Sequence, residues 1–198
     1  GQVLVFVDEA DQATGKRESG AGDSGLSGRV YAMLAKEMSN TQNRGKIIWV
    51  FATSRPDLLE VDLKRPGRLD VHIPLFAPQN AKEKAALFKA MAKKLKVRVS
   101  TLPAIPDNFD IGGNEMEAMI VRANRRYDLQ TRGKKSYKAI LTEVMADYRT
   151  MAHRSKLEYM DMIAVKECTD SRFLPQHYRK MSLDEIEARI LELEPHMH

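Results

Sequence analysis

Two carboxylates stand side by side at the end of an apolar run near the start of the chain. Val3 to Val7 reads VLVFV, and Asp8 and Glu9 follow it directly. Five successive apolar residues predict a strand buried on both faces, as in the middle of a parallel sheet. Open α/β sheets bind their ligands in the crevice beyond the carboxyl ends of the strands. The acidic pair is therefore placed to act on a ligand, although a strand that runs into a solvated acidic turn would show the same pattern.

A second strand of the same kind also ends in polar residues. Ile47 to Thr53 reads IIWVFAT, and Ser54 follows it. Between the two strands the spacing of apolar residues predicts a helix of about a dozen residues that begins near Leu26 or Ser27. Parallel strands need such a crossover, which would bring the polar ends of both strands to the same edge of the sheet.

Two arginines follow, three residues apart. Arg65 and Arg68 flank a turn at Pro66 and Gly67, and residues 69–76 are expected to form a third strand. The planar guanidinium fork binds pairs of phosphate oxygens and keeps its charge, so this pair suits a phosphate that gains negative charge during a reaction. Arginines in turns are also common as solvated or ion-paired surface groups.

These motifs together carry a resemblance to a known family. A buried strand that ends in Asp-Glu has the form of a Walker B element of P-loop nucleotide hydrolases. In their order, VLVFVDEAD, IIWVFATSRPD and KRPGRLD resemble the AAA+ ATPases, in particular the AAA subgroup with its second region of homology. The resemblance covers residues 3–76 and continues through a helical lid to about Tyr127. It implies a partial P-loop α/β core with parallel strands and a crossover helix, followed by an all-helical lid. Beyond residue 136 the resemblance fades, and the spacing of apolar residues predicts a C-terminal helical extension.

The resemblance also implies roles for individual residues. Asp8 would organise Mg²⁺ and help to bind ATP, and Glu9 would be the catalytic base. Ser54 falls where the family's sensor 1 residue positions the attacking water, and Gly113 and Asn114 fall where the lid backbone approaches the nucleotide. Arg65 and Arg68 fall on the arginine fingers, which reach the nucleotide of the neighbouring subunit. A homo-oligomeric ring, usually a hexamer, is therefore expected.

Two departures from the family pattern bear on function. Ser54 stands where this subgroup normally has Asn, and a serine offers one short hydroxyl instead of an amide. The phosphate-binding motif GxxxxGK[ST] occurs nowhere in the 198 residues. We therefore expect the chain to be a fragment of a longer ATPase, cut just before Walker B and inert towards ATP by itself.

The substrate and two alternative functions stay open at this stage. The full-length protein is expected to remodel or unfold a macromolecule, with protein favoured over nucleic acid. Lys16 and Arg17 lie in a loop where the family's second pore loop faces the substrate, and a plain solvated linker is the other interpretation. One alternative, favoured by Ser54, is a non-catalytic scaffold or ring subunit. The other is a nucleic-acid-dependent motor, suggested by the literal DEAD string at residues 8–11, a pI of about 9.3 and basic residues near Arg125.

Three parts are expected along the chain, and the charge distribution marks a boundary near Pro78. The expected parts are residues 1–76 for the α/β core, 77–136 for the lid and 137–198 for the extension, where Leu157, Met160, Ile163 and Ala164 predict one buried helical face. The net charge is +5, and all of the excess base lies after residue 76. A single cysteine excludes an internal disulfide framework, and no apolar run suggests a membrane span or a signal peptide. A cytoplasmic protein is therefore predicted.

Overall fold

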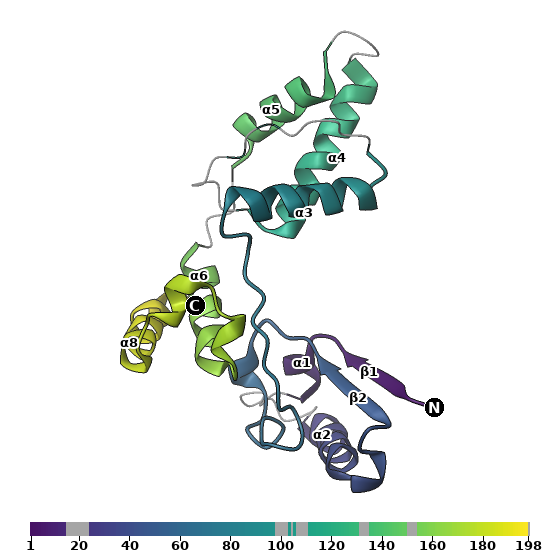
Figure 1. Ribbon diagram of the computed structural model, residues 1–198, viewed down its shortest axis with the longest axis vertical. Coiled ribbons are helices and arrows are strands. Elements are labelled where there is room, and N and C mark those ends of the chain that lie inside the picture. The colour runs from purple at the N-terminus through teal and green to yellow at the C-terminus, as the bar shows by residue number, and fades with distance from the viewer. Residues whose placement is uncertain are drawn as a thin grey trace. The chain divides into compact units, whose positions relative to one another are not determined.

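The computed structural model divides into two compact units. It describes residues 1–14, 24–97, 103, 105, 111–130, 135–149 and 154–197. The first unit consists of Gly1–Pro74 together with His153–His198, and the second consists of Leu75–Ala152. Figure 1 shows the elements of both units, and each unit is described here by itself.

The first unit contains a pair of parallel strands joined by a crossover. Strand β1 (Val3–Val7) pairs with β2 (Ile47–Phe51) in parallel, with Val3 opposite Ile47 and Val7 opposite Phe51. The connection runs through the short helix α1 (Ala10–Thr14), helix α2 (Ser24–Ser39) and a 3₁₀ turn η1 (Thr41–Asn43). The predicted parallel strands and crossover helix are thus confirmed, with α2 beginning a few residues earlier than expected.

The prediction that both faces of these strands are buried is wrong. One face packs on α2: Trp49 and Phe51 contact a cluster that includes the buried residues Met38 and Leu63. The opposite face carries Leu4, Phe6 and Ile48, which are 62%, 58% and 54% exposed. The alternation arises because successive side chains of a strand point to opposite faces, and α2 covers only one of them.

The predicted third strand does not form. Within residues 24–97 the structure assigns no strand after β2, and residues 69–76 follow the 3₁₀ turn η2 (Pro56–Leu58) without pairing in a ladder. The backbone N–H of His72 instead donates to the hydroxyl of Thr169, at 2.9 Å. An apolar run makes a strand only where a neighbouring strand supplies the pairing groups, and this segment has a side-chain partner instead.

Three helices from the end of the chain complete the first unit. They are α6 (Arg154–Glu167), α7 (Gln176–Arg179) and α8 (Leu183–Leu193), with 3₁₀ turns η3 (Ser171–Phe173) and η4 (Glu194–Met197). Their shared core contains Tyr159, Met162, Ile163 and Leu193. Helix α8 begins with a capping box, in which the Ser182 hydroxyl accepts from the Glu185 N–H and the Glu185 carboxylate accepts from the Ser182 N–H.

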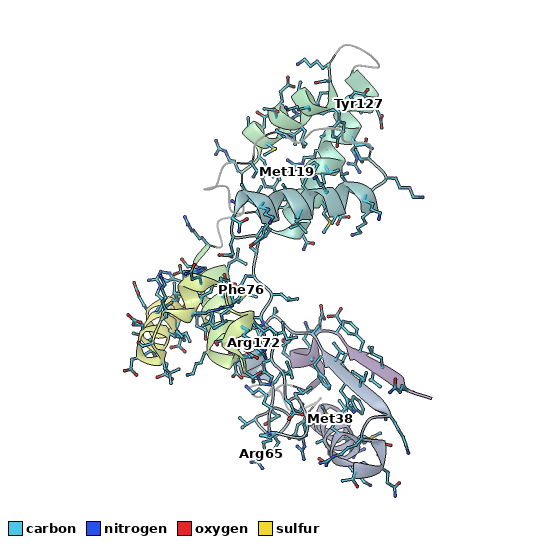
Figure 2. All side chains as sticks on the ribbon, viewed as in Figure 1. Met38, Arg65, Phe76, Met119, Tyr127 and Arg172 are labelled. Carbon is cyan, nitrogen blue, oxygen red and sulfur yellow. The ribbon has the colours of Figure 1, made fainter. Side chains whose placement is uncertain are left out.

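The second unit is helical, as predicted for the lid. Helices α3 (Ala81–Lys94), α4 (Gly113–Gln130) and α5 (Tyr137–Asp147) enclose a core that includes Phe88, Met116, Met119, Ile120, Leu141 and Val144. Figure 2 labels Met119 in this core and Met38 in the core of the first unit. None of the helices in the described ranges combines the length and the apolar character that crossing a membrane needs.

The units divide residues 137–198 differently from the sequence-based expectation. Helix α5 packs against α4 within the second unit, whereas α6 and α8 pack on each other within the first. The apolar face of α5 contributes Ile140, Leu141, Val144 and Met145 to the core of the second unit. Helices α6 to α8 thus belong to the same unit as Asp8 and Arg65.

Candidate functional site

The two parallel strands bring three predicted site residues to one edge of the sheet. Beyond the last ladder pair the backbones stay joined, since the N–H of Ala52 donates to the carbonyl of Val7 at 2.9 Å and the N–H of Ala10 donates to the carbonyl of Ala52 at 3.0 Å. Asp8 and Glu9 lie within this junction, and Ser54 follows it two residues after Ala52. All three side chains are exposed at the carboxyl ends of the strands. That position is where open α/β sheets hold ligands.

Glu9 has a strained backbone. Its φ is 48°, in the left-handed region that residues other than glycine rarely adopt. The conformation is held from both sides, because the Glu9 N–H donates to Oδ1 of Asp8 at 3.0 Å and the Glu9 carbonyl accepts from the N–H of Gln12 at 2.9 Å. Strained residues of this kind concentrate at functional sites. The backbone of Glu9 is thus held by hydrogen bonds on both sides of the strained residue.

A hydrogen bond that the sequence did not reveal joins the two strand ends. The hydroxyl of Thr53 donates to Oδ1 of Asp11, which lies at the start of α1. The same hydroxyl accepts from the backbone N–H of Arg55 at 2.9 Å. Ser54 therefore sits in a turn that is tied to the segment carrying Asp8 and Glu9.

The two arginines occupy different surroundings. Arg65 forms an ion pair with Asp62 at 2.9 Å, and its side chain is 69% exposed. Figure 2 shows it at the margin of the first unit. Arg68 is tied into its own subunit, since its Nε donates to Oγ of Ser39 at 2.9 Å and its Nη1 to the carbonyl of Asp62 at 2.8 Å. Arg65 is thus the freer of the two to reach a group outside this chain.

The turn between the arginines requires glycine. Gly67 has a φ of +88°, a conformation that a side chain would strain. The turn is closed by the N–H of Arg68, which donates to the carbonyl of Arg65 at 3.2 Å, and by the N–H of Gly67, which donates to the Asp70 carboxylate. The sequence signal for a turn at this place was therefore correct.

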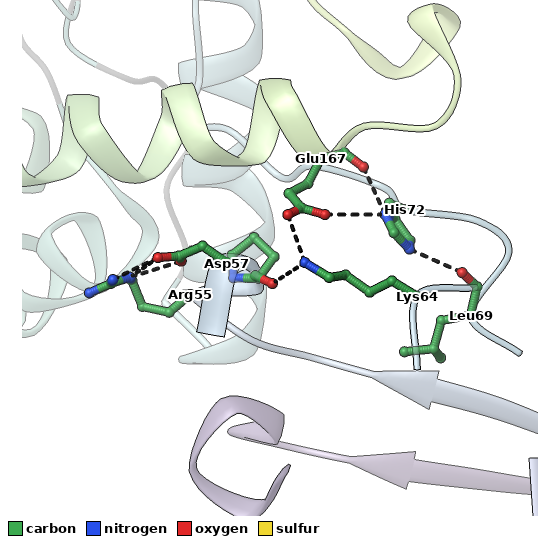
Figure 3. Close-up of polar contacts among 7 residues, drawn as sticks. Arg55, Asp57, Lys64, Leu69, His72 and Glu167 are labelled. Carbon is green, nitrogen blue, oxygen red and sulfur yellow. Dashed lines mark hydrogen bonds and ion pairs between the residues drawn. The ribbon is translucent and has the colours of Figure 1, made fainter. Parts of the chain in front are cut away.

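The segment that carries the arginines rests on α6. Glu167, the last residue of α6, accepts from Nζ of Lys64 at 2.7 Å, and its backbone carbonyl contacts Nδ1 of His72 at 2.7 Å. Figure 3 shows Lys64 and His72 converging on Glu167. Eight residues earlier on α6, the guanidinium of Arg55 lies over the ring of Tyr159, 5.7 Å from its centroid. These contacts are between residues far apart in the sequence, which is why sequence reasoning missed them.

Arg55 also forms a two-pronged ion pair with Asp57. Its Nε and Nη2 donate to the carboxylate at 2.9 and 2.7 Å, as Figure 3 shows. These hydrogen bonds raise the pKa of the Arg55 guanidinium above its ordinary value. Burial is the main cause that raises the pKa of the Tyr159 phenol beneath it. Arg55, the residue after Ser54, therefore has a structural role through Asp57 and Tyr159.

Gly113 and Asn114 belong to the second unit. Gly113 is the first residue of α4, and the N–H of the preceding Gly112 donates to the Glu115 carboxylate at 2.9 Å. A Cβ built on Gly113 would meet its nearest neighbour, the Met91 methyl, at 3.6 Å, which is an ordinary contact. Packing within the lid therefore does not explain the glycine. Asn114 is exposed.

Two further predictions concern charged residues. Lys16 and Arg17 lie outside the described residues. In the basic cluster of the lid, Arg126 pairs with Asp147 at 3.3 Å and Lys135 with Glu143 at 2.7 Å. Arg122 lies over the ring of Tyr148, 5.7 Å from its centroid. Part of the cluster is thus neutralised or stacked within the lid, which weakens its fit to a phosphate backbone.

The side chains at the strand ends suit a magnesium ion that has other ligands as well. Nowhere in the described part of the chain do three or more His, Cys, Asp or Glu side chains gather as a metal cage would require. Mg²⁺ typically takes one or two protein carboxylates and completes its shell with water and substrate phosphates. Asp8 fits that use, since its exposed carboxylate accepts one backbone hydrogen bond and keeps further oxygen lone pairs for a metal.

Comparison with known proteins identifies the first part of the chain. The family model described as "ATPase family associated with various cellular activities (AAA)" matches residues 1–76. Residues 1–76 therefore belong to the AAA family. The match includes both strands, the crossover and the two arginines, and it ends where the second unit begins.

Curated relatives match longer stretches of the chain than the family model does. Protein CdcH of Halobacterium salinarum is 32% identical over 131 residues, which are 63% of this chain and 17% of that protein. ATPase family protein 2 homolog of Caenorhabditis elegans is 39% identical over 94 residues, 48% of this chain and 13% of that protein. Peroxisomal ATPase PEX6 of Dictyostelium discoideum is 32% identical over 94 residues, 48% of this chain and 8% of that protein. The chain thus spans less than a fifth of the length of these relatives.

Proposed function

We propose that this chain supplies the water-activating half of an ATP-hydrolysis site, and the arginine fingers of a neighbouring one, within a longer ring-forming AAA ATPase. The observation that carries the proposal is the meeting of Asp8, Glu9 and Ser54 at one edge of a parallel strand pair. The AAA match supports ATP as the substrate. The phosphates need a cradle of backbone N–H groups, and the 198 residues contain no GxxxxGK[ST] to form one.

Glu9 is the proposed general base. A carboxylate that points into a ligand crevice can accept the proton of a water molecule as that water attacks the terminal phosphate. The strained turn at Glu9 would give its carboxylate a direction different from that of Asp8. Asp8 could then bind a metal while Glu9 acts on a water. Asp8 would hold Mg²⁺, which neutralises charge on the phosphate oxygens when bound.

Ser54 is proposed to orient the attacking water. Its hydroxyl can donate one hydrogen bond and accept another, which is enough to hold a water in line. The bond from Thr53 to Asp11 keeps the Ser54 turn beside the Glu9 turn. Positioning of this kind lowers the barrier by removing the entropy cost of bringing the reactants together.

Arg65 is proposed to act on the nucleotide of the next subunit, from a turn that Arg68 supports. The exposed Arg65 would supply the guanidinium that stabilises charge on the transferred phosphoryl group, a contribution of about 10³ to 10⁵ in rate where it has been isolated. Arg68 would hold the turn through its contacts with Ser39 and Asp62. AAA proteins generally form oligomeric rings, and we infer a homohexamer, because a finger that leaves its own chain needs a neighbour to act on.

The remaining roles follow from the same assembly. Gly113 and Asn114 would let the start of α4 approach the nucleotide, which gives a reason for a glycine that lid packing does not need. Lys16 and Arg17 are proposed substrate contacts, and a protein substrate is favoured, because part of the basic lid cluster is internally paired. We expect the ring to work in the cytoplasm.

Replacing Glu9 tests the proposal in the full-length protein. Glu9→Gln keeps size and hydrogen bonding but cannot take a proton, so ATP binding should persist while turnover falls by about 10² or more. Glu187→Gln, which changes an exposed ion pair on α8, is the matched control and should keep full turnover. Unchanged turnover in Glu9→Gln would refute the role. The 198-residue chain alone should show no tight ATP binding in calorimetry.

A non-catalytic ring subunit is the second candidate, and Ser54 is the observation that favours it. A serine reaches less far than the Asn usual in this subgroup. Saturating ATP with no turnover in the wild-type full-length protein, together with intact ring assembly, would establish this alternative. Gain of turnover on Ser54→Asn would then identify the serine as the cause.

A further inference from the structure

Helix α6 holds the arginine-bearing segment at two separated points. At its first contact the ring of Tyr159 lies under Arg55, directly after Ser54. At the second contact, the carboxylate of Glu167, at the end of α6, accepts a hydrogen bond from Lys64, the residue before Arg65. One helix thus contacts both the turn at Ser54, which is proposed to position water, and the turn at residues 65–68, called the finger turn below. Figure 3 shows the second contact.

Glu167 ties both flanks of the finger turn. Its carboxylate accepts from Nζ of Lys64 at 2.7 Å, and Nζ also donates to the carbonyl of Pro56 at 3.0 Å. On the other flank, Nδ1 of His72 lies 2.7 Å from the Glu167 carbonyl, and Nε2 lies 3.0 Å from the carbonyl of Leu69. The turn that carries Arg65 therefore enters and leaves through residues that Glu167 holds.

The ion pair between Lys64 and Glu167 is less exposed to solvent than the other ion pairs of α6. The side chains of Lys64 and Glu167 are only 13% and 25% exposed. By contrast, Lys166 and Glu187, which join α6 to α8, are 44% and 46% exposed. A solvent-exposed pair holds its geometry weakly, whereas breaking a shielded pair leaves an uncompensated charge in a poorly hydrated place.

We propose that Glu167 is a positioning residue for Arg65, so that helix α6 of one subunit controls the hydrolysis site of its neighbour. This inference rests on the proposed action of Arg65 in the adjacent site. Glu167 touches neither nucleotide nor water in this role. It sets where the turn presents Arg65, and a displacement of about 1 Å in a positioning element can cost about 10² in rate.

The test compares Glu167→Ala and the milder Glu167→Gln with Glu187→Ala in the full-length protein. Glu167→Ala should lower kcat by about 10- to 100-fold while KM for ATP stays within about 2-fold, because a finger acts on the transition state. Glu167→Gln, which can still accept from Lys64, should lie between Glu167→Ala and wild type. Glu187→Ala should match wild type. Equal turnover in the Glu167 and Glu187 variants would overturn the inference.

Mixing subunits separates positioning from general damage. Glu9→Gln subunits have an inactive site but intact fingers, so adding them to Glu167→Ala subunits should restore turnover at the sites whose neighbour is Glu9→Gln. No restoration would mean that Glu167 serves its own site or only the fold, and the inference would fail. If Glu167→Ala proves unfolded by thermal denaturation, Glu167→Gln in the same mixture decides.

Arg65→Ala is measured in parallel to keep the two proposals apart. A loss of turnover in Arg65→Ala without one in Glu167→Ala contradicts the positioning role alone. Full turnover in Arg65→Ala contradicts the finger role itself, and the inference about Glu167 fails with it.

Discussion

The hydroxyl of Thr53 donates a hydrogen bond to the carboxylate of Asp11, which joins the turn after β2 to the start of α1. The two residues are 42 positions apart, and each lies within three residues of a proposed catalytic group. Parallel pairing aligns the strands, but it stops at their ends. The bond between Thr53 and Asp11 holds together the loops that follow the two strands, where the proposed chemistry takes place.

Replacing Thr53 with valine should uncouple the two loops. Valine keeps the shape but loses the bonds to Asp11 and to the Arg55 N–H, so we expect a fall in turnover of about 10-fold and a loss of about 1 to 2 kcal/mol in the free energy of unfolding. Thr142→Val is the control, since its hydroxyl donates to the Lys138 carbonyl on the exposed side of α5, within the second unit. Equal turnover in the two variants would contradict the coupling.

The strain at Glu9 predicts an unusual order of stabilities. At a φ of 48°, glycine is less strained than alanine, so Glu9→Gly should be more stable to urea than Glu9→Ala by about 1 kcal/mol. At Ala188 in the middle of α8 the order should reverse, and Ala188→Gly should destabilise by a similar amount. Both Glu9 variants should lack turnover. Greater stability of Glu9→Ala would show that the strained turn is not present in solution.

The two arginines should differ in what their loss does to the fold. Arg68→Ala removes two hydrogen bonds to Ser39 and Asp62, so the free energy of unfolding should fall by about 1 to 2 kcal/mol. Arg65→Ala removes only an exposed ion pair and should change it by less than about 0.5 kcal/mol. Urea titrations of both variants measure the difference. Equal losses would contradict the distinct surroundings of the two side chains.

Asp161 should make stability depend on pH. Burial raises its pKa from 3.8 to about 6, against the opposing effect of a hydrogen bond from Tyr178. The folded state therefore binds the proton more tightly, so the stabilisation from this carboxyl is full below about pH 3.8 and is lost as pH rises through about 6. Asp161→Asn should gain stability relative to wild type between pH 4 and pH 7.

Asp170 provides the control for this pH dependence. Its hydrogen bonds with Arg172 lower its pKa to about 2, so its contribution is present above pH 3.8 and is lost only as pH falls towards 2. The difference between Asp170→Asn and wild type should thus be constant from pH 5 to pH 7. An Asp161→Asn difference that is equally constant would contradict a raised pKa at Asp161.

Local patterns predicted much of the fold and of the site. The strands, the crossover and the capping box at Ser182 follow from residues close together in sequence. Burial could not be predicted in the same way, because it depends on what covers each face. Phe6 is 58% exposed, although its strand is apolar throughout. On α6 the expected buried face included Leu157, which is 60% exposed, while Tyr159 is buried against α8.

The contacts that organise the finger segment had no sequence signal. Lys64 and Glu167 are 103 residues apart, with the whole lid between them. Neither a basic residue in a turn nor an acidic residue at a helix end points to the other. The residues of the proposed chemistry were identified because a family resemblance preserves their order, whereas the residues that support them are specific to how this chain folds back.

Turnover in mixed rings of Arg65→Ala and Glu9→Gln subunits tests the central claim most directly. Neither variant alone should hydrolyse ATP appreciably, since one lacks the finger and the other the base. In the mixture, sites that pair an intact Glu9 with an intact Arg65 from the next subunit should restore measurable turnover, with a maximum at intermediate mixing ratios. Turnover that stays at the level of the separate variants at every ratio, with mixed rings verified, would contradict a site shared between subunits.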